Sequence, residues 1–286
     1  MKPDTPPDYL LIGHVAHDVT PHGPMLGGTV SYAAHTAAAF GIHVGIITST
    51  AANEPVLVDL PPGVSIINVP APHSTTFDNR YTPTGRIQFM YHRATPLDPD
   101  AVPPAWREAR LIHLAPIAYE VAPELVTLFG EHRICATPQG WMRQREQDSR
   151  VREVDWPDAT RVLPATHLTV ISEEDIRHNP GLEAEFAQLA PLLVVTRGPQ
   201  GGTFYQNGQR STFTTPTVEQ VDPTGAGDIF ATALHIALDR LGDIERALTI
   251  AAELASRSVT RRGFASAPTR DEVDHAWRAH TNEGFK

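Results

Sequence analysis

Hydrophobic residues along the chain fall into short continuous runs that alternate with stretches of helical periodicity. Short apolar runs of this kind are typical of strands buried on both faces of a sheet, and they span residues 9–12, 43–48, 111–114, 134–136, 167–171 and 192–196. Apolar residues at helical spacing predict helices at residues 29–40, 121–129, 183–189, 228–241, 244–261 and 270–280. This alternation predicts an α/β fold in which helices cover a mostly parallel sheet. Ligands of such folds bind beyond the carboxyl ends of the strands.

Residues 64–91 interrupt the alternation, because they carry no helical pattern. They contain three extended stretches, at residues 64–69, 75–81 and 87–91, and a Thr-Pro-Thr-Gly turn joins the last two. We interpret them as a small antiparallel sheet that projects from the main body and covers a ligand. A surface hairpin without a role is the alternative.

The loop 222–228 reads Asp-Pro-Thr-Gly-Ala-Gly-Asp and leads directly into a predicted helix. Gly225, Ala226 and Gly227 therefore lie at a helix N-terminus, where unpaired backbone N–H groups and the helix dipole favour an anion. Their small size lets a phosphate approach the backbone closely. A carboxylate beside a phosphate is chemically useful if it accepts the proton of an attacking hydroxyl, and Asp228 is placed for that role. An ordinary glycine-rich helix start is the alternative.

Composition limits the classes of function. The chain has 286 residues, of which 41% are hydrophobic, enough for one large α/β core. A net charge of -10 argues against nucleic acid or an anionic membrane as the main partner. The polar, proline-rich start and the lack of an apolar run of about 20 residues predict a cytoplasmic protein without a membrane segment. The single cysteine, Cys135, lies in an apolar run, which predicts a buried, inert thiol.

Lysine is almost absent from the sequence. The only lysines are Lys2 and Lys286, at the two ends of the chain. This excludes the lysine of a Walker A loop, the ATP-binding lysine of protein kinases and Schiff-base chemistry within the fold. A chain of this kind that handles phosphates must use helix N-termini, arginines and a metal ion.

Three features of the sequence resemble the PfkB family of carbohydrate kinases. The loop 222–228 is close to the C-terminal signature of that family, and residues 27–34, Gly-Gly-Thr-Val-Ser-Tyr-Ala-Ala, are similar to its N-terminal glycine motif. Asp18 occupies the position of the family's substrate-binding aspartate. The resemblance covers essentially the whole chain. It implies a ribokinase-like three-layer sandwich with a small β lid, and a single kinase domain at residues 1–286, with the lid formed by about 14–26 and 64–95.

The family resemblance implies an ATP-dependent phosphotransferase that acts on a hydroxyl of a sugar or polyol. Asp228 would be the general base, and the amides of Gly225, Ala226 and Gly227 would bind the transferring group. Mg²⁺ would supply the positive charge that the missing lysines cannot. Family members often pair through their lids, so we also expect a homodimer.

The same resemblance implies three sets of contacts. For the acceptor they are Asp18, Gly27, Gly28, Asn79, Arg86 and Gln139. For ATP they are Thr196, Arg197, Gly198, Thr224, Gly225, Gly227, Ala252 and Ser256. For metals they are Ser172 and Asp175, which would hold Mg²⁺ through water, and Asp222, which either binds a monovalent cation such as K⁺ or braces its own loop.

Departures from the family pattern leave the acceptor open. Tyr32 stands where many sugar kinases have Asn, and Ala136 stands where Asp is frequent. The family's Asn-x-x-Glu is here Ser172 to Asp175, which keeps a polar group and a carboxylate at the same spacing. A nucleoside kinase is one alternative, and Tyr32 stacking on a base would favour it. A non-catalytic nucleotide or sugar sensor is the other.

Overall fold

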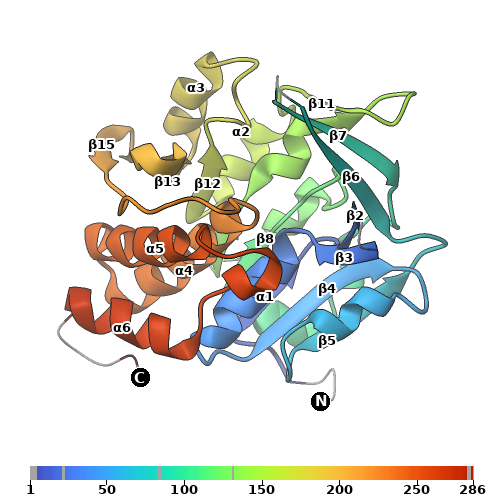
Figure 1. The fold of residues 1–286 in the computed structure, drawn as a ribbon, viewed down its shortest axis with the longest axis horizontal. Helices are drawn as coiled ribbons and strands as arrows, with labels where there is room; N and C mark the ends of the chain where they lie inside the picture. The colour runs from blue at the N-terminus through green and yellow to red at the C-terminus, as the bar shows by residue number, and fades with distance from the viewer. Residues whose placement is uncertain (1–4, 21–22, 83–84, 131, 282–284, 286) are drawn as a thin grey trace.

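The computed structural model of the protein describes residues 5–20, 23–82, 85–130, 132–281 and 285, without the side chains of residues 81, 82, 85 and 86. In these residues, nine strands form one large sheet in the order β15-β14-β13-β12-β9-β8-β1-β4-β5 (Figure 1). The strands from β13 to β5 run parallel, and β14 and β15 are antiparallel additions at one edge. Their bounds are Tyr9–Ile12 (β1), Val44–Thr50 (β4), Ser65–Pro70 (β5), Leu111–Leu114 (β8), Arg133–Ala136 (β9), Leu168–Ser172 (β12), Leu192–Thr196 (β13), Gly202–Gln206 (β14) and Gln209–Phe213 (β15). The predicted α/β fold with a mostly parallel sheet is confirmed.

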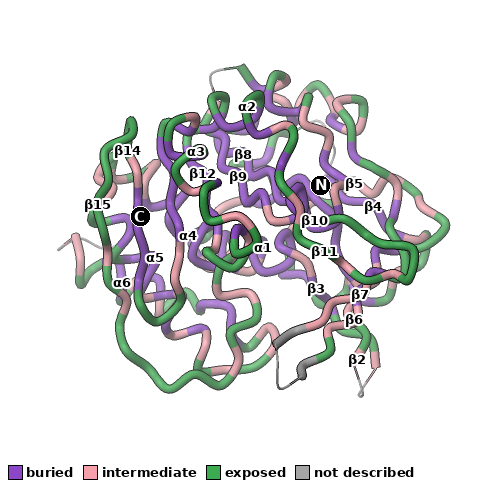
Figure 2. The backbone as a smooth tube through the Cα atoms, turned by 90° about the horizontal axis from the view of Figure 1, so that it is seen from above, coloured by how far each residue is buried: buried purple, intermediate pink, exposed green. Residues whose placement is uncertain are grey.

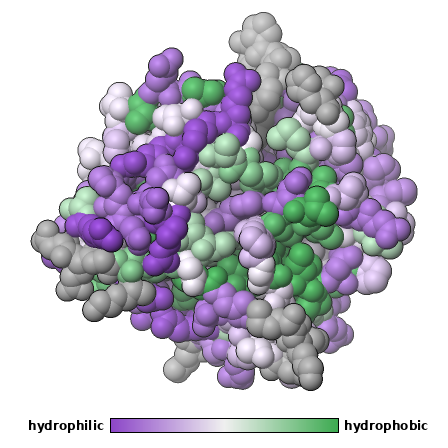
Figure 3. Space-filling view, turned by 60° about the horizontal axis from the view of Figure 1, so that its bottom comes forward, coloured by the Kyte–Doolittle hydropathy of each residue, from purple (hydrophilic) through white to green (hydrophobic). Residues whose placement is uncertain are grey.

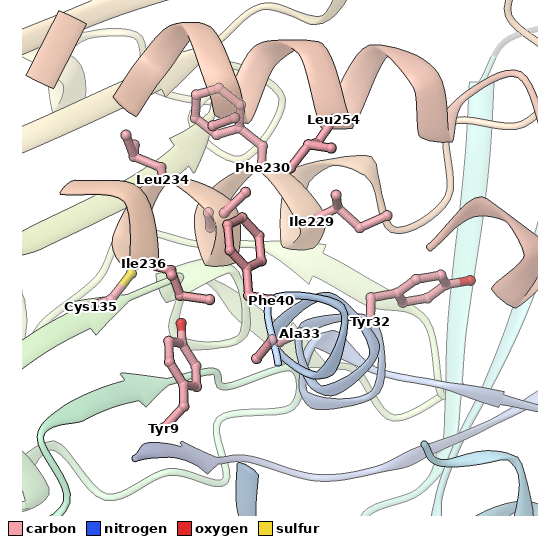
Figure 4. Close-up of a cluster of buried hydrophobic side chains, with 14 of the residues drawn as sticks. Tyr9, Tyr32, Ala33, Phe40, Cys135, Ile229, Phe230, Leu234, Ile236 and Leu254 are labelled. Atoms are coloured by element: carbon pink, nitrogen blue, oxygen red, sulfur yellow. The ribbon is translucent and has the colours of Figure 1, made fainter. Parts of the chain in front are cut away.

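Helices cover both faces of the large sheet and create two hydrophobic cores. One core contains the buried sides of α1 (Thr29–Ala39), α4 (Ala226–Leu241), α5 (Ile244–Ser258) and α6 (Arg270–Thr281). The other contains α2 (Ala159–Val162), α3 (Gly181–Leu189) and several 3₁₀ helices. Figure 2 shows the buried backbone as a continuous layer through the middle of the molecule. Cys135 lies in the first core (Figure 4), where burial raises the pKa of its thiol, in agreement with the predicted inert role.

Prolines and glycines decide where several helices begin and end. The 3₁₀ helices span Pro55–Asp59 (η1), Pro99–Ala101 (η2), Pro104–Glu108 (η3), Pro123–Thr127 (η4), Pro138–Met142 (η5), Leu163–Ala165 (η6), Gly198–Gln200 (η7) and Gly263–Ser266 (η8). The helix predicted for residues 121–129 is wrong, because only η4 forms there. Pro123 starts that turn without an N–H to donate, and its preceding residue is extended.

The small sheet stands over the carboxyl-end side of the large one. Its order is β3-β2-β6-β7, with bounds Gly23–Gly27 (β3), Ala16–Thr20 (β2), Thr75–Thr82 (β6) and Gly85–His92 (β7). The pair β2–β6 is parallel and the other two pairs are antiparallel. The predicted small sheet therefore exists, but the assignment of residues 64–69 to it is wrong. That segment is β5, which pairs in parallel with β4 at the edge of the large sheet.

His14 anchors the root of the small sheet. Its buried ring lies between β1 and β2, with Nδ1 2.6 Å from the Thr75 hydroxyl and Nε2 2.8 Å from the carbonyl of Thr95. Because a carbonyl only accepts, Nε2 carries the proton and Nδ1 accepts from Thr75. One side chain thus joins the three chain segments that connect the two sheets.

A hairpin formed by β10 (Arg143–Arg145) and β11 (Val151–Glu153) leans against the small sheet. The Met90 amide donates to the carbonyl of Ser149 at 2.8 Å, and Arg145 Nε donates to the carbonyl of Met90 at 2.6 Å. The green hairpin lies beside β7 in Figure 1. The outer edge of β7 is therefore partly covered by the protein itself.

The described surface is mixed in character. Figure 3 shows one face on which hydrophobic side chains gather among hydrophilic ones. Among the described residues, the large hydrophobic side chains that are exposed are Val19, Met25, Val58, Ile66, Tyr91, Val218 and Val221. None of the described helices combines the length and the apolar content that crossing a membrane requires.

Candidate active site

Backbone N–H groups are exposed at the start of α4. Gly225 precedes the helix in the left-handed conformation, with φ 79°, and no side chain caps the helix. The Ala226 amide donates to the carbonyl of Pro223 at 3.2 Å. In the described part of the chain, the amides of Gly225 and Gly227 donate to no other protein group, and the space beside Gly227 is open. The predicted three-amide anion site thus has two amides free to bind in this conformation.

Asp228 lies beside these amides, half-buried in the first turn of α4. Burial raises the pKa of its carboxyl group to about 6. A hydrogen bond with the Thr29 hydroxyl and the positive charge of Arg143 act in the opposite direction, whereas the negative charge of Asp175 adds to the rise. Such a carboxylate is ionised at pH 7 and is a stronger base than an exposed aspartate.

The Tyr32 ring packs against Gly225 of the loop 222–228. Its ring is 4% exposed, stacks on Phe264 at 4.7 Å, and lies where a Cβ atom at Gly225 would have to be. Figure 4 shows Tyr32 at the edge of the core, on α1 and near the start of α4. Both faces of the ring are therefore occupied by the protein. The suggestion that Tyr32 stacks on a nucleoside base is not supported by this arrangement.

The first carboxylate of the loop has a bracing contact. Asp222 Oδ1 accepts a hydrogen bond from the Thr224 amide at 3.0 Å, and the Val221 and Asp222 amides both donate to the carbonyl of Val259. These bonds fix the loop to the end of α5. The bracing alternative for Asp222 is present in the structure, and its role toward a monovalent cation stays a prediction.

A second carboxylate follows strand β12. Asp175 accepts from the Ser172 amide at 2.9 Å and from Gln139 Nε2 at 3.1 Å. Gln139 was predicted to contact the acceptor, but its side chain is hydrogen-bonded to Asp175, the carboxylate predicted to hold the metal. No group of three or more His, Cys, Asp or Glu side chains able to hold a metal occurs among the described residues. Oxygen donors on Asp175 and Ser172 fit Mg²⁺ that keeps most of its waters and is held mainly by phosphates.

Of the predicted acceptor residues, Asp18, Gly27, Gly28 and Asn79 lie on or directly beside the small sheet. Asp18 lies directly against Gly27, and a Cβ atom at Gly28, whose φ is 87°, would be 2.7 Å from the carbonyl of His14. Asn79 lies on β6 and accepts from Gln88 of β7 at 2.9 Å. The Arg86 side chain is outside the described part of the structure.

On the donor side, Arg197 is already paired. Its guanidinium donates twice to the Glu183 carboxylate at 2.7 Å and to the Thr203 hydroxyl at 2.8 Å. Its positive charge is therefore neutralised within the protein, which argues against the predicted contact with phosphate. Thr196 donates to the carbonyl of Ile171 at 3.3 Å, and Gly198 is exposed at the start of η7.

A cavity of about 290 Å³ lies along α5, on the side where we expected the nucleotide base. Ala252 lines it, and the other lining residues are Thr214, Thr215, Pro216, Thr249, Glu253 and His280. Ser256, one turn further along α5, hydrogen-bonds the Thr215 hydroxyl at 2.7 Å. The amides of Val221 and Asp222 donate to the carbonyl of Val259 at the end of the same helix, so α5 connects the cavity with the loop that leads to the anion site.

Residues 139–270 match the sequence profile described as pfkB family carbohydrate kinase. They include the loop 222–228, Asp175 and all of the cavity lining except His280. Over this part of the chain, slightly less than half of it, the predicted family is confirmed. The predicted enzyme class, a phosphotransferase with an alcohol group as acceptor, agrees with the match.

Curated relatives of the chain are kinases named for different acceptors. Fructokinase of Escherichia coli is 27% identical over 193 residues, which cover 60% of this chain and 62% of that protein. Cytidine kinase of Thermococcus kodakarensis is 26% identical over 287 residues, which cover 90% of this chain and 97% of that protein. The chain thus spans slightly less than two thirds of the first relative and nearly all of the second.

Solved structures share the ribokinase-like fold. A pyrophosphate-dependent myo-inositol-1 kinase, converted into a myo-inositol-3 kinase by two substitutions, has a TM-score of 0.79, with 19% identity over 96% of this chain and 100% of that one. Ribokinase of Arabidopsis thaliana, complexed with ribose and ATP, has a TM-score of 0.73, with 16% identity over 95% of this chain and 99% of that one. At these identities the likeness shows the fold, and the two proteins use different phosphoryl donors.

Sequence reasoning missed two residues that act on Asp228. Thr29 begins α1 directly after the glycine motif, and its hydroxyl bonds the carboxylate. The signal in the sequence is its place, directly after Gly27 and Gly28 of the glycine motif and at the start of a predicted helix. Arg143 is remote in sequence and follows no motif, so only the fold brings its charge to the site.

Proposed function

We propose that this protein is a small-molecule kinase that transfers the γ-phosphoryl group of ATP to a hydroxyl of a sugar or polyol. The observation that carries this proposal is the half-buried carboxylate of Asp228, with a pKa of about 6, next to the free amides of Gly225 and Gly227. A base and an anion site in this arrangement suit a hydroxyl that loses its proton while it attacks phosphorus.

In the proposed mechanism, Asp228 accepts the proton of the acceptor hydroxyl as its oxygen bonds to the γ-phosphorus. The amides of Gly225 and Gly227 stabilise the charge on the transferring group, and the bond to the leaving diphosphate breaks. Mg²⁺ supplies charge neutralisation when bound, and Asp175 and Ser172 are the residues that would hold it through water. The small sheet excludes water, which would otherwise compete with the acceptor.

Two features of the donor side support ATP. The cavity along α5 has room beside Ala252, and the loop that leads to the anion site is hydrogen-bonded to the end of that helix. Pyrophosphate is the alternative donor, and a structural neighbour that depends on pyrophosphate supports it. A kinase that uses pyrophosphate would not need a cavity for a nucleotide base, because pyrophosphate has none.

A donor-by-acceptor screen tests the proposal. Ribose, fructose, myo-inositol and cytidine are each incubated with ATP–Mg²⁺ or pyrophosphate–Mg²⁺, with the Asp228→Asn variant as a blank. We expect turnover with ATP and a sugar or polyol. Turnover with cytidine alone would favour a nucleoside kinase, the activity of a relative. Tight ATP binding without transfer to any acceptor would instead indicate a sensor.

The activity is expected to depend on the ionisation of Asp228. The raised pKa of about 6 means that the base becomes protonated as the pH falls through 6, so kcat/KM should be about tenfold lower at pH 5 than on the plateau above pH 7. Steady-state assays between pH 5 and 8 at constant free Mg²⁺ measure this. A profile that is flat from pH 5 to 7 would contradict the assignment of the base. Any residual activity of Asp228→Asn should lack this acid limb.

We also propose that two copies pair through the outer faces of their small sheets. Val19 is 45% exposed there and Tyr91 is 36% exposed, so pairing would cover apolar surface. Light scattering at micromolar concentration is expected to give twice the chain mass of 31.2 kDa. A mass of one chain under these conditions would remove the proposal.

A further inference from the structure

Two amide side chains face each other on the inner side of the small sheet. Asn79 of β6 is paired across the strands with Gln88 of β7, and the Gln88 side-chain N–H donates to the Asn79 side-chain carbonyl at 2.9 Å. Both residues are half-buried. The sequence indicated Asn79 as an acceptor contact, but it gave no role to Gln88.

The strand alternation fixes which way this pair faces. Phe77 and Met90 are the preceding cross-strand pair on the same face, each 4% exposed, and they pack on Ile117 and Ala118 of the main body. Asp78 and its ion-pair partner Arg80 lie on the opposite face of the sheet, so they take no part in the packing of Phe77 and Met90 on the main body. The amide pair therefore lies on the body-facing side, one step further toward the tip of the sheet.

A chain of contacts connects this face to the base. Ile117, beneath Phe77 and Met90, also lies 3.3 Å from the position of a Cβ atom at Gly28. Gly28 precedes Thr29, whose hydroxyl bonds Asp228. Asp18 is next to Phe77 on the same face of the sheet. The face thus offers a carboxylate and an amide pair at separate points above the loop that holds the base.

The hydrogen bond within the pair determines what it presents to a ligand. Since the Asn79 oxygen accepts from Gln88, Asn79 has N–H donors left and Gln88 has a carbonyl acceptor left. In the described part of the chain, these remaining groups bond to no other protein atom. One donor beside one acceptor complements two neighbouring hydroxyls, because each hydroxyl both donates and accepts.

We propose that Gln88, held by Asn79, is a specificity-determining residue that sets which hydroxyl of the acceptor reaches Asp228. The inference rests on the proposed kinase function. A polyol ring has several similar hydroxyls, and Asp18 alone leaves the ring free to turn about one anchor. A second anchor on β7 fixes the rotation and therefore the position that is phosphorylated.

The test compares Gln88→Leu and Gln88→Met, which remove the amide at similar length, with Arg80→Gln on the opposite face of the sheet. With ATP–Mg²⁺ and myo-inositol, ribose or fructose, whichever turns over, we expect both Gln88 variants to raise the acceptor KM about two- to tenfold, the effect of one neutral hydrogen bond. Phosphorus–proton NMR should show a mixture of phosphorylated positions. The donor KM and the Arg80→Gln variant should match wild type.

An unchanged acceptor KM and an unchanged product isomer in both Gln88 variants, at wild-type melting temperature, would overturn the inference. Asn79→Leu provides a second measurement, because it should reproduce the Gln88 effect, and the double variant should be no worse than either single one. If wild type turns over none of these acceptors, the proposed function fails separately. Calorimetry with the same three compounds then tests the pair: weaker binding by Gln88→Leu supports it, and equal binding contradicts it.

Discussion

Replacing Asp228 with Asn is expected to lower kcat by a factor of about 10²–10⁴ and, at the same time, to make the protein more stable at pH 7. The loss of rate follows from removing the base. The gain in stability follows from the pKa of about 6 in the folded protein, compared with the ordinary value of 3.8. The folded state holds this proton more tightly than the unfolded state, so ionisation at pH 7 opposes folding by about 1–3 kcal/mol.

The sign of this effect gives the experiment its control. Stability contributed by the proton is present below pH 4 and is lost as the pH rises through 6, so the melting temperatures of wild type and Asp228→Asn should differ by a few degrees at pH 7 and converge near pH 4. Asp222→Ala, a substitution of the other carboxylate in the loop, should lower stability instead, because it removes the oxygen that accepts the Thr224 amide. Full activity of Asp228→Asn would remove the proposed mechanism.

Replacing Gly225 with Ala is expected to disrupt the anion loop. A residue with a Cβ atom is strained at a φ of 79°, at a cost of about 1–2 kcal/mol. The added methyl group would also overlap the Tyr32 ring, which is stacked on Phe264 and cannot easily move. Together these effects should lower the free energy of unfolding by about 2–4 kcal/mol and reduce kcat at least tenfold.

Gly227→Ala is the matched control for this prediction. Gly227 lies two residues further on, inside α4, and its Cβ atom would meet no neighbour. Denaturant unfolding should show little loss of stability for Gly227→Ala, whereas its activity reports how closely phosphate approaches that amide. Equal unfolding free energies for the two variants would show that neither the backbone conformation nor Tyr32 constrains the loop.

The parts of the fold that were predicted correctly depend on local pattern. The long apolar stripe after loop 222–228 fixed α4, because its periodicity continues over several turns. Apolar runs such as residues 192–196 coincide with strands. The error at residues 64–69 has a different origin: a short extended segment does not reveal its partner, and β5 joins β4 through contacts that the segment itself does not encode.

One hairpin was missed although the sequence contains its signal. Strands β14 and β15 are joined by Asn207 and Gly208, with φ values of 51° and 78°. Asn-Gly is the pair that favours a two-residue turn with both residues in this region. The hairpin was not predicted because the strands were identified from apolar runs, and polar residues predominate in β15.

In the candidate site, too, the features contained in one local segment were predictable and those that join separate elements were not. Asp228 and its neighbouring amides were predictable, because the chemistry is contained in seven consecutive residues. The pairing of Arg197 with Glu183 and the charge of Arg143 near Asp228 were not, because each joins residues on separate elements. A guanidinium next to a predicted phosphate loop is equally compatible with an ion pair until the fold shows which acid lies nearby.

The hairpin that leans against the small sheet contacts both halves of the proposed reaction. Arg145 donates to the carbonyl of Met90 on β7, and Arg143, two residues earlier, lowers the pKa of Asp228. A substitution that displaced this hairpin would therefore change the support of the acceptor cover and the charge beside the base together.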